Sequence, residues 1–303
     1  MSSNHPVPIV VAGSLNMDLV LEVPRVPAAG ETLSGRTFRL VPGGKGANQA
    51  VACARLGGKV AMVGRVGADE FGTTLRRGLE QDGILLDHVG VDTDVSTGVA
   101  LILVDDSAQN RIVVVPGANG TFAPANVDAA GAWIDGAKLV LVQLETPMPS
   151  VEHAIQRAVR AGVPVLLNPA PAQALSDDVL RSVDYLVPNE TEASMLTGIE
   201  VTDVTSAAAA ARSLRQRGAR CVLITLGPRG VLIADDDGVR DHAAARVQAV
   251  DTTAAGDTFI GGLSVGLVEG MTLDAAARFA MQAAALSVTR PGAQTSIPYR
   301  SEI

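Results

Sequence analysis

The stretch Asp251-Thr252-Thr253-Ala254-Ala255-Gly256-Asp257 lies between a short apolar run at residues 247–250 and a small-residue-rich amphipathic segment at residues 258–269. We expect a strand for the first segment and a helix for the second. Small residues and a glycine at a helix start let backbone N–H groups point at an anion, and the helix dipole adds positive partial charge there. The stretch therefore predicts an anion site where a strand turns into a helix.

Asp257 falls on the first turn of the expected helix, beside this anion site. A carboxylate is a poor ligand for phosphate but a suitable base for a hydroxyl that attacks a phosphoryl group. Asp is also common near helix N-termini for purely structural reasons. The seven residues alone leave both interpretations open, and the rest of the chain has to decide between them.

The composition predicts a large aliphatic core. Of the 303 residues, 47% are hydrophobic and only 3% are aromatic, so Ala, Val and Leu must fill the core, as in helices packed on a parallel sheet. The net charge of −8 and the lack of a Lys/Arg-rich run argue against nucleic acid or an anionic membrane as a partner. No stretch reaches the roughly 20 uninterrupted apolar residues of a membrane span.

Two further features predict a cytoplasmic protein. Residues 1–8 are polar and run directly into an expected strand, so we predict no signal peptide. Cys53 and Cys221 are far apart, and each lies in an apolar segment. We therefore expect two buried thiols in a reducing compartment rather than a disulfide.

Strand-like and helix-like segments alternate along the chain, which predicts an α/β fold with a doubly wound, mainly parallel sheet flanked by helices. The first strand, at residues 8–13, is followed by Asn16 and Asp18 and not by a dinucleotide-binding Gly-x-Gly-x-x-Gly turn, which disfavours an oxidoreductase. This amide and carboxylate would bind a ligand at the edge of the sheet, or they are only turn-forming residues. We find no linker or repeat and expect a single domain over residues 1–303.

Two segments depart from this alternation and predict a small inserted β-sheet lid. Residues 18–41 contain two extended runs around a Pro-rich turn, and residues 97–116 contain another pair around a polar turn at residues 105–110. We expect these strands to cover a site. Exposed apolar faces on them would pair with a second subunit, so we predict a homodimer through the lid strands.

A glycine-rich turn, Gly43-Gly44-Lys45-Gly46, precedes a helical run that ends at residues 57–58. It is not a P-loop, because Gly46 stands where that motif requires Ser or Thr. Such a turn lets the backbone approach a polar ligand, which Lys45 and Asn48 would hydrogen-bond. As structure only, it is a flexible strand-to-helix connection.

Other expected strands also end in polar or glycine residues. Asn189 with Glu192 would hold a hydrated Mg²⁺ or a water near phosphate, or would form a capping box at a helix start. The carboxyl ends of parallel strands meet at one edge of a sheet, where α/β folds bind ligands. We therefore expect one site that contains Asp18, Gly44, Glu145, Asn189, Gly227 and Asp257.

Seven motifs together resemble those of the ribokinase-like (pfkB) carbohydrate kinases, and within this family those of the ribokinases. The resemblance covers essentially the whole chain. The motifs are Asn16-Met17-Asp18, residues 43–50, Gln143-Leu144-Glu145, Asn168-Pro169-Ala170-Pro171, residues 188–192, residues 225–230 and residues 251–257.

The resemblance implies a kinase that phosphorylates ribose at its 5-hydroxyl with ATP, with Asp257 as general base. Backbone N–H groups of Ala254, Ala255 and Gly256 would form an anion hole for charge that develops on the phosphoryl group. The implied sugar pocket contains Asn16, Asp18, Gly44, Lys45, Asn48 and Glu145, next to Asp257.

The same resemblance implies ATP, Mg²⁺ and an activating monovalent cation, usually K⁺. Glu192 would help to place Mg²⁺ through water. The nucleotide would contact Asn189, Thr225, Gly227, Gly230 and Gly256. The positions that match the monovalent-cation site, partly through backbone carbonyls, are Asp251, Thr253, Ser287, Arg290, Gly292 and Ser296.

Two alternatives stay open. Members of the family phosphorylate different substrates, so a kinase of another pentose or of a nucleoside, such as deoxyribose or adenosine, would carry the same motifs. A sugar or nucleotide sensor without activity would keep the binding residues, but it has no need of a base at Asp257.

Overall fold

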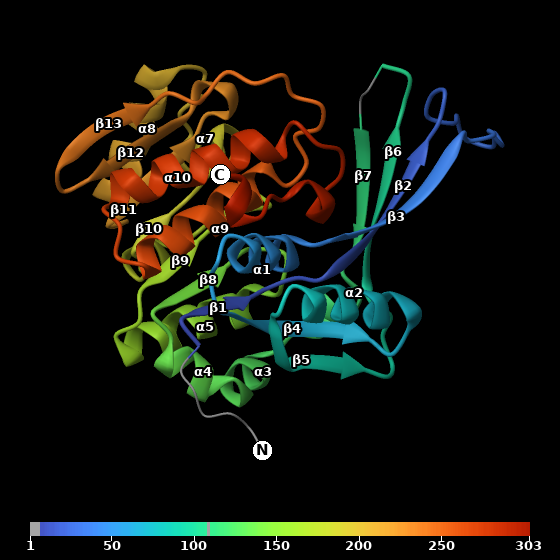
Figure 1. The fold of residues 1–303 in the computed structure, drawn as a ribbon, viewed down its shortest axis with the longest axis horizontal. Helices are drawn as coiled ribbons and strands as arrows, with labels where there is room; N and C mark the ends of the chain where they lie inside the picture. The colour runs from blue at the N-terminus through green and yellow to red at the C-terminus, as the bar shows by residue number, and fades with distance from the viewer. Residues whose placement is uncertain (1–6, 108–109) are drawn as a thin grey trace.

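The computed structural model describes residues 7–107 and 110–303, which form two β-sheets and two layers of helices (Figure 1). Residues 1–6 of the polar N-terminus and residues 108–109 of the predicted turn lie outside this range. The large sheet has nine strands in the order β13-β12-β11-β10-β9-β8-β1-β4-β5, and the small sheet has four in the order β3-β2-β6-β7. The predicted α/β fold with a smaller inserted sheet is therefore confirmed.

All neighbouring strands of the large sheet are parallel except at one edge, where β12 pairs antiparallel with β11 and with β13. The chain enters at the interior strand β1, adds β4 and β5 on one side, and then returns to add β8 to β11 on the other. Such a doubly wound sheet opens a crevice at the carboxyl ends of the two strands where the direction reverses, here β1 and β8. The strands are β1 Ile9–Ala12, β4 Val60–Gly67, β5 Leu85–Asp92, β8 Leu139–Val142, β9 Val165–Leu167, β10 Tyr185–Leu186, β11 Cys221–Thr225, β12 Val231–Asp235 and β13 Gly238–His242.

Helices cover both faces of this sheet. One face packs against α1 Lys45–Arg55, α2 Glu70–Gln81, α9 Ala255–Val268 and α10 Leu273–Ser287. The other packs against α3 Pro124–Ala129, α4 Gly131–Gly136, α5 Met148–Ala161, α6 Asp177–Arg181, α7 Glu190–Thr197 and α8 Val204–Gln216. Single 3₁₀ turns lie at Gly117–Thr121, Gly227–Arg229, Gln294–Ser296 and Arg300–Glu302.

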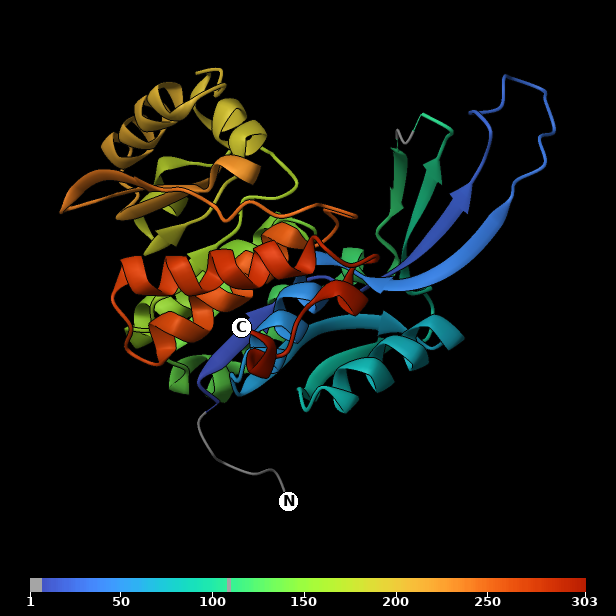
Figure 2. The same ribbon diagram turned by 45° about the horizontal axis from the view of Figure 1, so that its top comes forward.

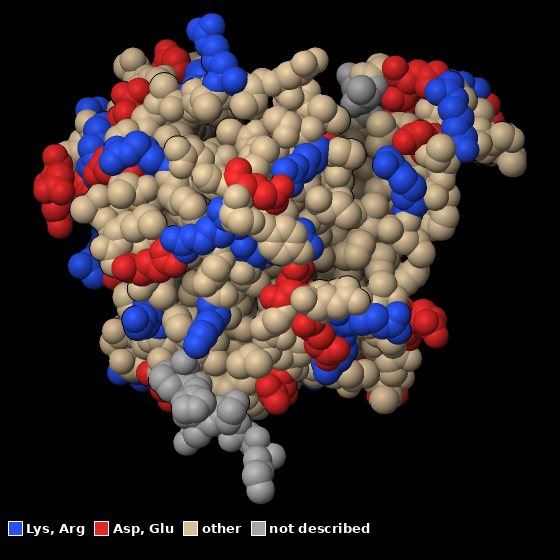
Figure 3. Space-filling model, viewed as in Figure 1, with Lys and Arg blue, Asp and Glu red and all other residues tan. Residues whose placement is uncertain are grey.

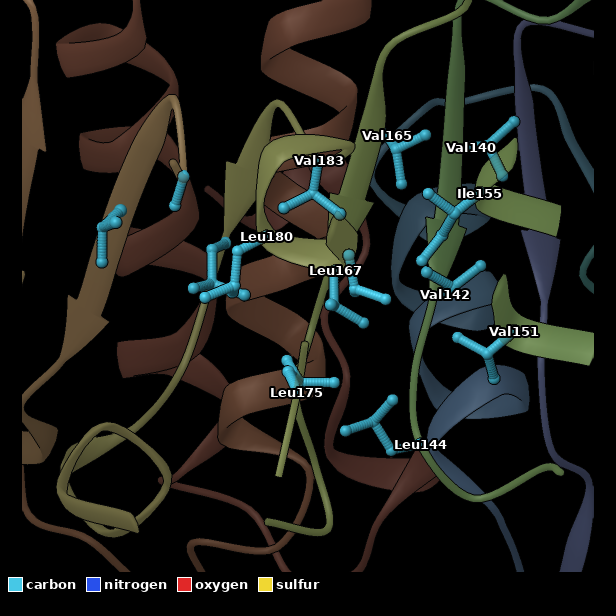
Figure 4. Packing of buried hydrophobic residues seen from close by; sticks show 14 of the residues in the cluster. Val140, Val142, Leu144, Val151, Ile155, Val165, Leu167, Leu175, Leu180 and Val183 are labelled. Atoms are coloured by element: carbon cyan, nitrogen blue, oxygen red, sulfur yellow. The ribbon is translucent and has the colours of Figure 1, made fainter. Parts of the chain in front are cut away.

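The short central strands are buried on both faces, which is why they are continuously aliphatic and do not alternate with polar residues. Alternate side chains of β8 enter the two cores: Val140 and Val142 face α5, whereas Leu141 belongs to the core under α1 and α9. Figure 4 shows Val140 and Val142 beside Ile155 of α5. Aliphatic side chains thus fill both cores, as the composition predicts.

Helices α1 and α9 approach each other through small side chains. A Cβ on Gly261 would lie 2.4 Å from the Cβ of Ala52, so no larger residue fits at this crossing. The Cys53 thiol contacts the Gly261 carbonyl at 3.7 Å. This packing brings the N-termini of the two helices together at the carboxyl edge of the sheet.

The small sheet projects beyond the carboxyl ends of the central strands (Figure 2). Its strands are β2 Asn16–Glu22, β3 Thr37–Gly43, β6 Gly98–Val104 and β7 Asn110–Val115. These strands largely coincide with the two segments predicted to form the lid, at residues 18–41 and 97–116, but β2 begins two residues earlier, at Asn16, and β3 ends two residues later, at Gly43.

Some sequence-based expectations need correction. Residues 247–250 are not a strand: Val247 and Val250 are 45% and 66% exposed, and the Val250 N–H donates to the carbonyl of Val288 instead of to the sheet. Strand β5 and helices α3 and α4 were not predicted from the sequence. Cys53 and Cys221 are buried and free, as predicted.

The surface of the described residues is mixed in charge. Figure 3 shows Lys and Arg side chains interspersed with Asp and Glu on one face, and pairs such as Arg290 with Glu302 link the two signs at 2.7 Å. Within residues 7–107 and 110–303, no helix combines the length and apolar character required to cross a membrane.

Candidate active site

Side chains from the N-termini of α1 and α9 form the centre of the candidate site. Asp257 lies in the first turn of α9, as predicted, and is buried. Its Oδ2 accepts a hydrogen bond from Asn48 Nδ2 at 3.0 Å, and its Oδ1 accepts one from Gln49 Nε2 at 3.0 Å. Both donors belong to α1, so each oxygen of the carboxylate is held by the neighbouring helix.

The surroundings of Asp257 make it a stronger base than a free aspartate. Burial raises its pKa above the usual value, and the negative charge of Glu145 acts in the same direction. The Lys45 ammonium and the hydrogen bonds from Asn48 and Gln49 oppose this shift. A base of this kind suits the removal of a proton from a hydroxyl during attack.

The N-terminus of α1 is capped by residues from the loops that follow β1 and β8. Gly44 precedes the helix and has no side chain for this purpose. Instead, Glu145 Oε2 accepts a hydrogen bond from the Lys45 N–H at 2.9 Å, and Ser14 Oγ accepts one from the Gly46 N–H at 3.2 Å. Ser14 Oγ also donates to Glu145 Oε2 at 2.5 Å. The loops after β1 and β8 are thus joined across the crevice and hold the helix between them.

The glycines of this turn have a steric explanation. A Cβ on Gly44 would lie 2.7 Å from the backbone nitrogen of Asn16, and a Cβ on Gly46 would lie 2.6 Å from that of Ser14. Gly44 also has a φ of 89°, which side chains disfavour. The close approach of α1 to the chain after β1 therefore requires both glycines, whether or not a ligand binds there.

Asp18 and Asn16 lie on the same face of β2, close to Asp257. Burial, followed by the charges of Glu145 and Asp257, raises the pKa of Asp18 to about 7. Asn16 is buried, and its Oδ1 accepts a hydrogen bond from Asn119 Nδ2 at 2.8 Å. The predicted sugar residues thus converge, and three carboxylates lie near enough to affect one another.

The turn at residues 254–256 is open in front of α9. Ala254 has a φ of 59°, the one non-glycine residue of the described chain in the left-handed region. The Ala255 N–H donates to the Thr252 carbonyl at 3.2 Å, so it is already in use without a ligand. A Cβ on Gly256 would meet no heavy atom within 4 Å, and the first N–H groups of a helix have no partner inside it. The backbone at Gly256 is therefore accessible to an anion.

The predicted nucleotide residues lie at the ends of β10 and β11. Asn189 caps α7 and forms a parallel bridge with Thr225. Glu192 Oε2 accepts from the Asn189 N–H at 2.8 Å and Oε1 accepts from Asn189 Nδ2 at 3.0 Å, which confirms the capping box. Gly227 is surrounded by open space, whereas a Cβ on Gly230 would lie 1.9 Å from the His242 carbonyl oxygen. Gly230 is thus required for packing against β13.

The two loops predicted to share a monovalent cation lie against each other. The Asp251 N–H donates to the Val288 carbonyl at 3.2 Å, and Asp251 Oδ2 accepts from the Gly292 N–H at 2.8 Å. Thr253 Oγ1 donates to the other carboxylate oxygen of Asp251 at 2.6 Å. Arg290 turns its guanidinium to Glu302, which leaves only its carbonyl as a possible ligand for a cation.

The chemistry of these donors limits which metal fits. Ser287 and Ser296 are fully buried, and their hydroxyl oxygens, with the Asp251 carboxylate, are hard oxygen donors. Among the described residues, no group of three or more His, Cys, Asp or Glu side chains is placed to hold a metal ion. The two serine hydroxyls donate to the Ala284 and Ala293 carbonyls, so only their oxygen lone pairs could serve as ligands of a cation.

Comparison with known proteins agrees with this geometry. The family model of pfkB family carbohydrate kinases matches residues 8–300. A ribokinase of Haemophilus influenzae is 47% identical over 97% of this chain and 96% of its own length, and a deoxyribokinase of Salmonella typhi is 40% identical over 96% and 95%. The structure of Arabidopsis thaliana ribokinase complexed with ribose and ATP superposes with a TM-score of 0.92 at 34% identity, over 98% of this chain and 97% of that one.

This chain belongs to the pfkB family of carbohydrate kinases. In this family member, several buried polar residues of the site were not predicted from the sequence. Gln49 and Asn168 lie in motifs that carry the family resemblance, but nothing in their local pattern separates them from their neighbours. Ser14 and Asn119 gave no signal, because the hydrogen-bond partners of their side chains in the site lie at least 32 residues away along the chain. These four residues are buried, and their hydrogen bonds hold the predicted site residues in place.

Replacement of Asp18 by asparagine should stabilise the ligand-free pfkB-family protein, and more at pH 8 than at pH 5. The pKa of Asp18 is about 7 in the folded chain against 3.8 for a free aspartate, so ionisation increasingly favours the unfolded chain as the pH rises between these values. An asparagine side chain has a similar shape and does not ionise. Melting temperatures of both proteins at the two pH values test this.

Asp94→Asn, in an exposed loop, is the matched control and should show no such dependence on pH. A gain for Asp18→Asn that is equal at both pH values, or larger at pH 5, would contradict the assignment.

Proposed function

We propose that this chain transfers the γ-phosphoryl group of ATP to O5 of D-ribose and forms ribose 5-phosphate. One observation carries the proposal: a buried carboxylate, Asp257, stands at a helix N-terminus between a polar pocket and an open backbone turn. The similarity to ribokinases over nearly the whole chain supports ribose as the acceptor.

Asp257 acts as the general base in this proposal. The O5–H bond of ribose breaks as its proton passes to the Asp257 carboxylate, while O5 forms a bond to the γ-phosphorus. The bond from that phosphorus to the bridging oxygen breaks, and ADP leaves with the electron pair. The N–H groups of Ala254 and Gly256, joined by that of Ala255 when it leaves the Thr252 carbonyl, and the positive end of the α9 dipole stabilise the charge that develops on the phosphoryl oxygens.

The sugar lies on the other side of Asp257, against β2 and α1. Asp18 accepts hydrogen bonds from paired ribose hydroxyls, and Asn16, Gly44, Lys45 and Glu145 complete the pocket. Asn48 Oδ1 is a buried acceptor with no hydrogen-bond partner among residues 7–107 and 110–303, and a sugar hydroxyl at this end of α1 would satisfy it. This unpaired oxygen favours a polyhydroxylated ligand over an apolar one.

The nucleotide lies along the loops after β10 and β11, near Asn189, Thr225 and Gly227. Both carboxylate oxygens of Glu192 already accept hydrogen bonds from Asn189, so Glu192 would hold Mg²⁺ through water rather than as a direct ligand. When bound, Mg²⁺ supplies positive charge to the phosphate oxygens of the nucleotide.

We place K⁺ among the oxygens of Asp251, Thr253, Ser287, Gly292 and Ser296, with the Arg290 carbonyl. When bound, K⁺ supplies positive charge behind the turn at residues 254–256. The loops that carry these oxygens already support that turn, because Asp251 links both to Thr253 and to Gly292. The site would therefore influence activity without contact to the substrate.

ADP release in the presence of ATP, Mg²⁺, K⁺ and a panel of ribose, deoxyribose, other pentoses and adenosine tests the function. We expect turnover with ribose far above the rest.

Asp257→Asn should reduce kcat by about 10²–10⁴-fold or more, because it removes the base. Ribose affinity, measured by calorimetry, should persist. Near-normal turnover of this variant would contradict the role of Asp257, and preference for deoxyribose would keep the mechanism and change the substrate.

Replacement of K⁺ by choline at constant ionic strength should reduce kcat strongly and leave ribose binding nearly unchanged. Choline is too large for the set of oxygens between the two loops. Asp251→Asn should raise the K⁺ concentration required for half-maximal activity, because it removes the one carboxylate of the set. Equal turnover in K⁺ and choline would rule out the cation site.

We propose a homodimer through the small sheet. Alternate residues of a strand face opposite sides, so Leu19 points away from the face that carries Asp18. In register with Leu19 lie Leu40, Leu101 and Val113, which form a row across all four strands and are 48%, 37% and 60% exposed. A continuous apolar row of this kind favours contact with a second copy of the same sheet.

The double variant Leu40→Asp/Val113→Asp should shift the protein to a monomer in sedimentation velocity experiments. Two charges in the middle of the apolar row would lose their water on association. Val159→Asp on α5, at a position 45% exposed, is the matched control and should not change the oligomeric state. A wild-type monomer, or a double variant that still dimerises, would contradict this interface.

A further inference from the structure

The buried amides around Asp257 form a chain whose direction is fixed. Gln143 Nε2, after β8, donates to Gln49 Oε1 at 2.6 Å, and both side chains are fully buried. Since the oxygen of the Gln49 amide faces Gln143, its NH₂ group faces the opposite side. There it donates to Asn168 Oδ1 at 3.2 Å and to Asp257 Oδ1 at 3.0 Å. Both N–H bonds of the amide are therefore used.

The reverse orientation of Gln49 is excluded by its neighbours. A rotated amide would place its oxygen against the acceptor oxygens of Asp257 and Asn168, with no hydrogen between them. Asn168 cannot adapt, because its own NH₂ group donates to the Val187 carbonyl at 2.9 Å. The residues after β8, β9 and β10 thus fix which atom of Gln49 reaches the carboxylate.

We propose that Gln49 is a positioning residue that keeps the Asp257 carboxylate ionised and holds its orientation at the start of α9. The inference rests on the proposed function. Gln49 gives Oδ1 a hydrogen-bond donor whose direction is fixed, and this donor favours the charged form of the carboxylate. Asn48 holds the second carboxylate oxygen, Oδ2, from the same helix.

The charges around Asp257 make such a donor necessary. Burial raises the pKa of Asp257, and Glu145 raises it further, whereas Lys45, Asn48 and Gln49 oppose the shift. Asp18, on β2, and Glu192, on α7, also interact with the Asp257 charge. Among these groups Lys45 is the one cation, and it faces three carboxylates besides Asp257. The loss of an amide donor should therefore favour the protonated form of Asp257.

Gln49→Leu should move the acidic limb of the kcat–pH profile upward by about one to two pH units, since a hydrogen bond to a charged group has about that effect on a pKa. The KM for ribose should change less than about twofold. Cys53→Ala is the matched control: it lies one turn further along α1, is fully buried and also contacts α9. It should leave the acidic limb in place, because it disturbs the helix contact without touching the carboxylate.

Gln49→Glu provides a second test if the leucine variant does not fold. It keeps the shape and an acceptor for Gln143, but adds a carboxyl group next to Asp257, which should shift the acidic limb at least as far. A ¹³C NMR titration of the Asp257 carboxyl group in wild type and variants measures ionisation without turnover. An unchanged titration and acidic limb would overturn the role of Gln49. A wild-type protein that phosphorylates no sugar would overturn the proposed function instead, and the titration would still decide this inference.

Discussion

The close contact between α1 and α9 is the constraint on which the site depends. A buried carboxylate without partners costs several kcal/mol, and a hydrogen bond to a charged group contributes about 1.5–3 kcal/mol. Asp257 receives two such bonds, both from α1, at 3.0 Å. Neither amide would reach it if the helices were further apart. The glycine at position 261 is therefore part of the active-site architecture although it lies a full turn below the carboxylate.

The acidic residues of the site also hold the fold together. Glu145 caps α1 through the Lys45 N–H, and Glu192 caps α7 through the Asn189 N–H. Burial acts to lower the pKa of the Lys45 ammonium, but Asp257, Glu145 and Glu192 together raise it. Lys45 is thus held in its charged form by the carboxylates that it balances. A ligand rich in hydroxyl donors would relieve the excess of acceptors that remains, which is a physical reason for this pocket to select a sugar.

Much of this arrangement could be predicted from local sequence patterns. The position of Asp257 on a helix, the extra strands at residues 18–41 and 97–116, and the capping box of Asn189 and Glu192 all follow from short-range rules. Interactions between distant segments could not be predicted this way. Gln49 becomes part of the site only because α1 packs on α9, 208 residues further along the chain.

The errors have the same origin. Residues 247–250 have the valines of a strand, but the carbonyl of Val288 satisfies the Val250 N–H outside the sheet. The edge strand β5 escaped detection because its exposed and buried residues follow no strict alternation, and Leu85 is 39% exposed. The cap of α1 gave no signal at all, because Gly44 lacks a side chain and Glu145 lies 100 residues away.

The period of strand β2 connects the two proposed surfaces of the small sheet. Asn16 and Asp18 face the sugar side, and Leu19, one residue on, faces the apolar row on the opposite side. A shift of β2 by one residue would exchange these faces, so the register must be fixed tightly. Asn119 provides such a fixation: it donates to Leu15 O and accepts from Leu15 N, both at 2.9 Å, directly before the strand begins. The two hydrogen bonds between Asn119 and Leu15 set the register of β2 for both faces. A displacement of β2 at its apolar face must therefore also move Asp18.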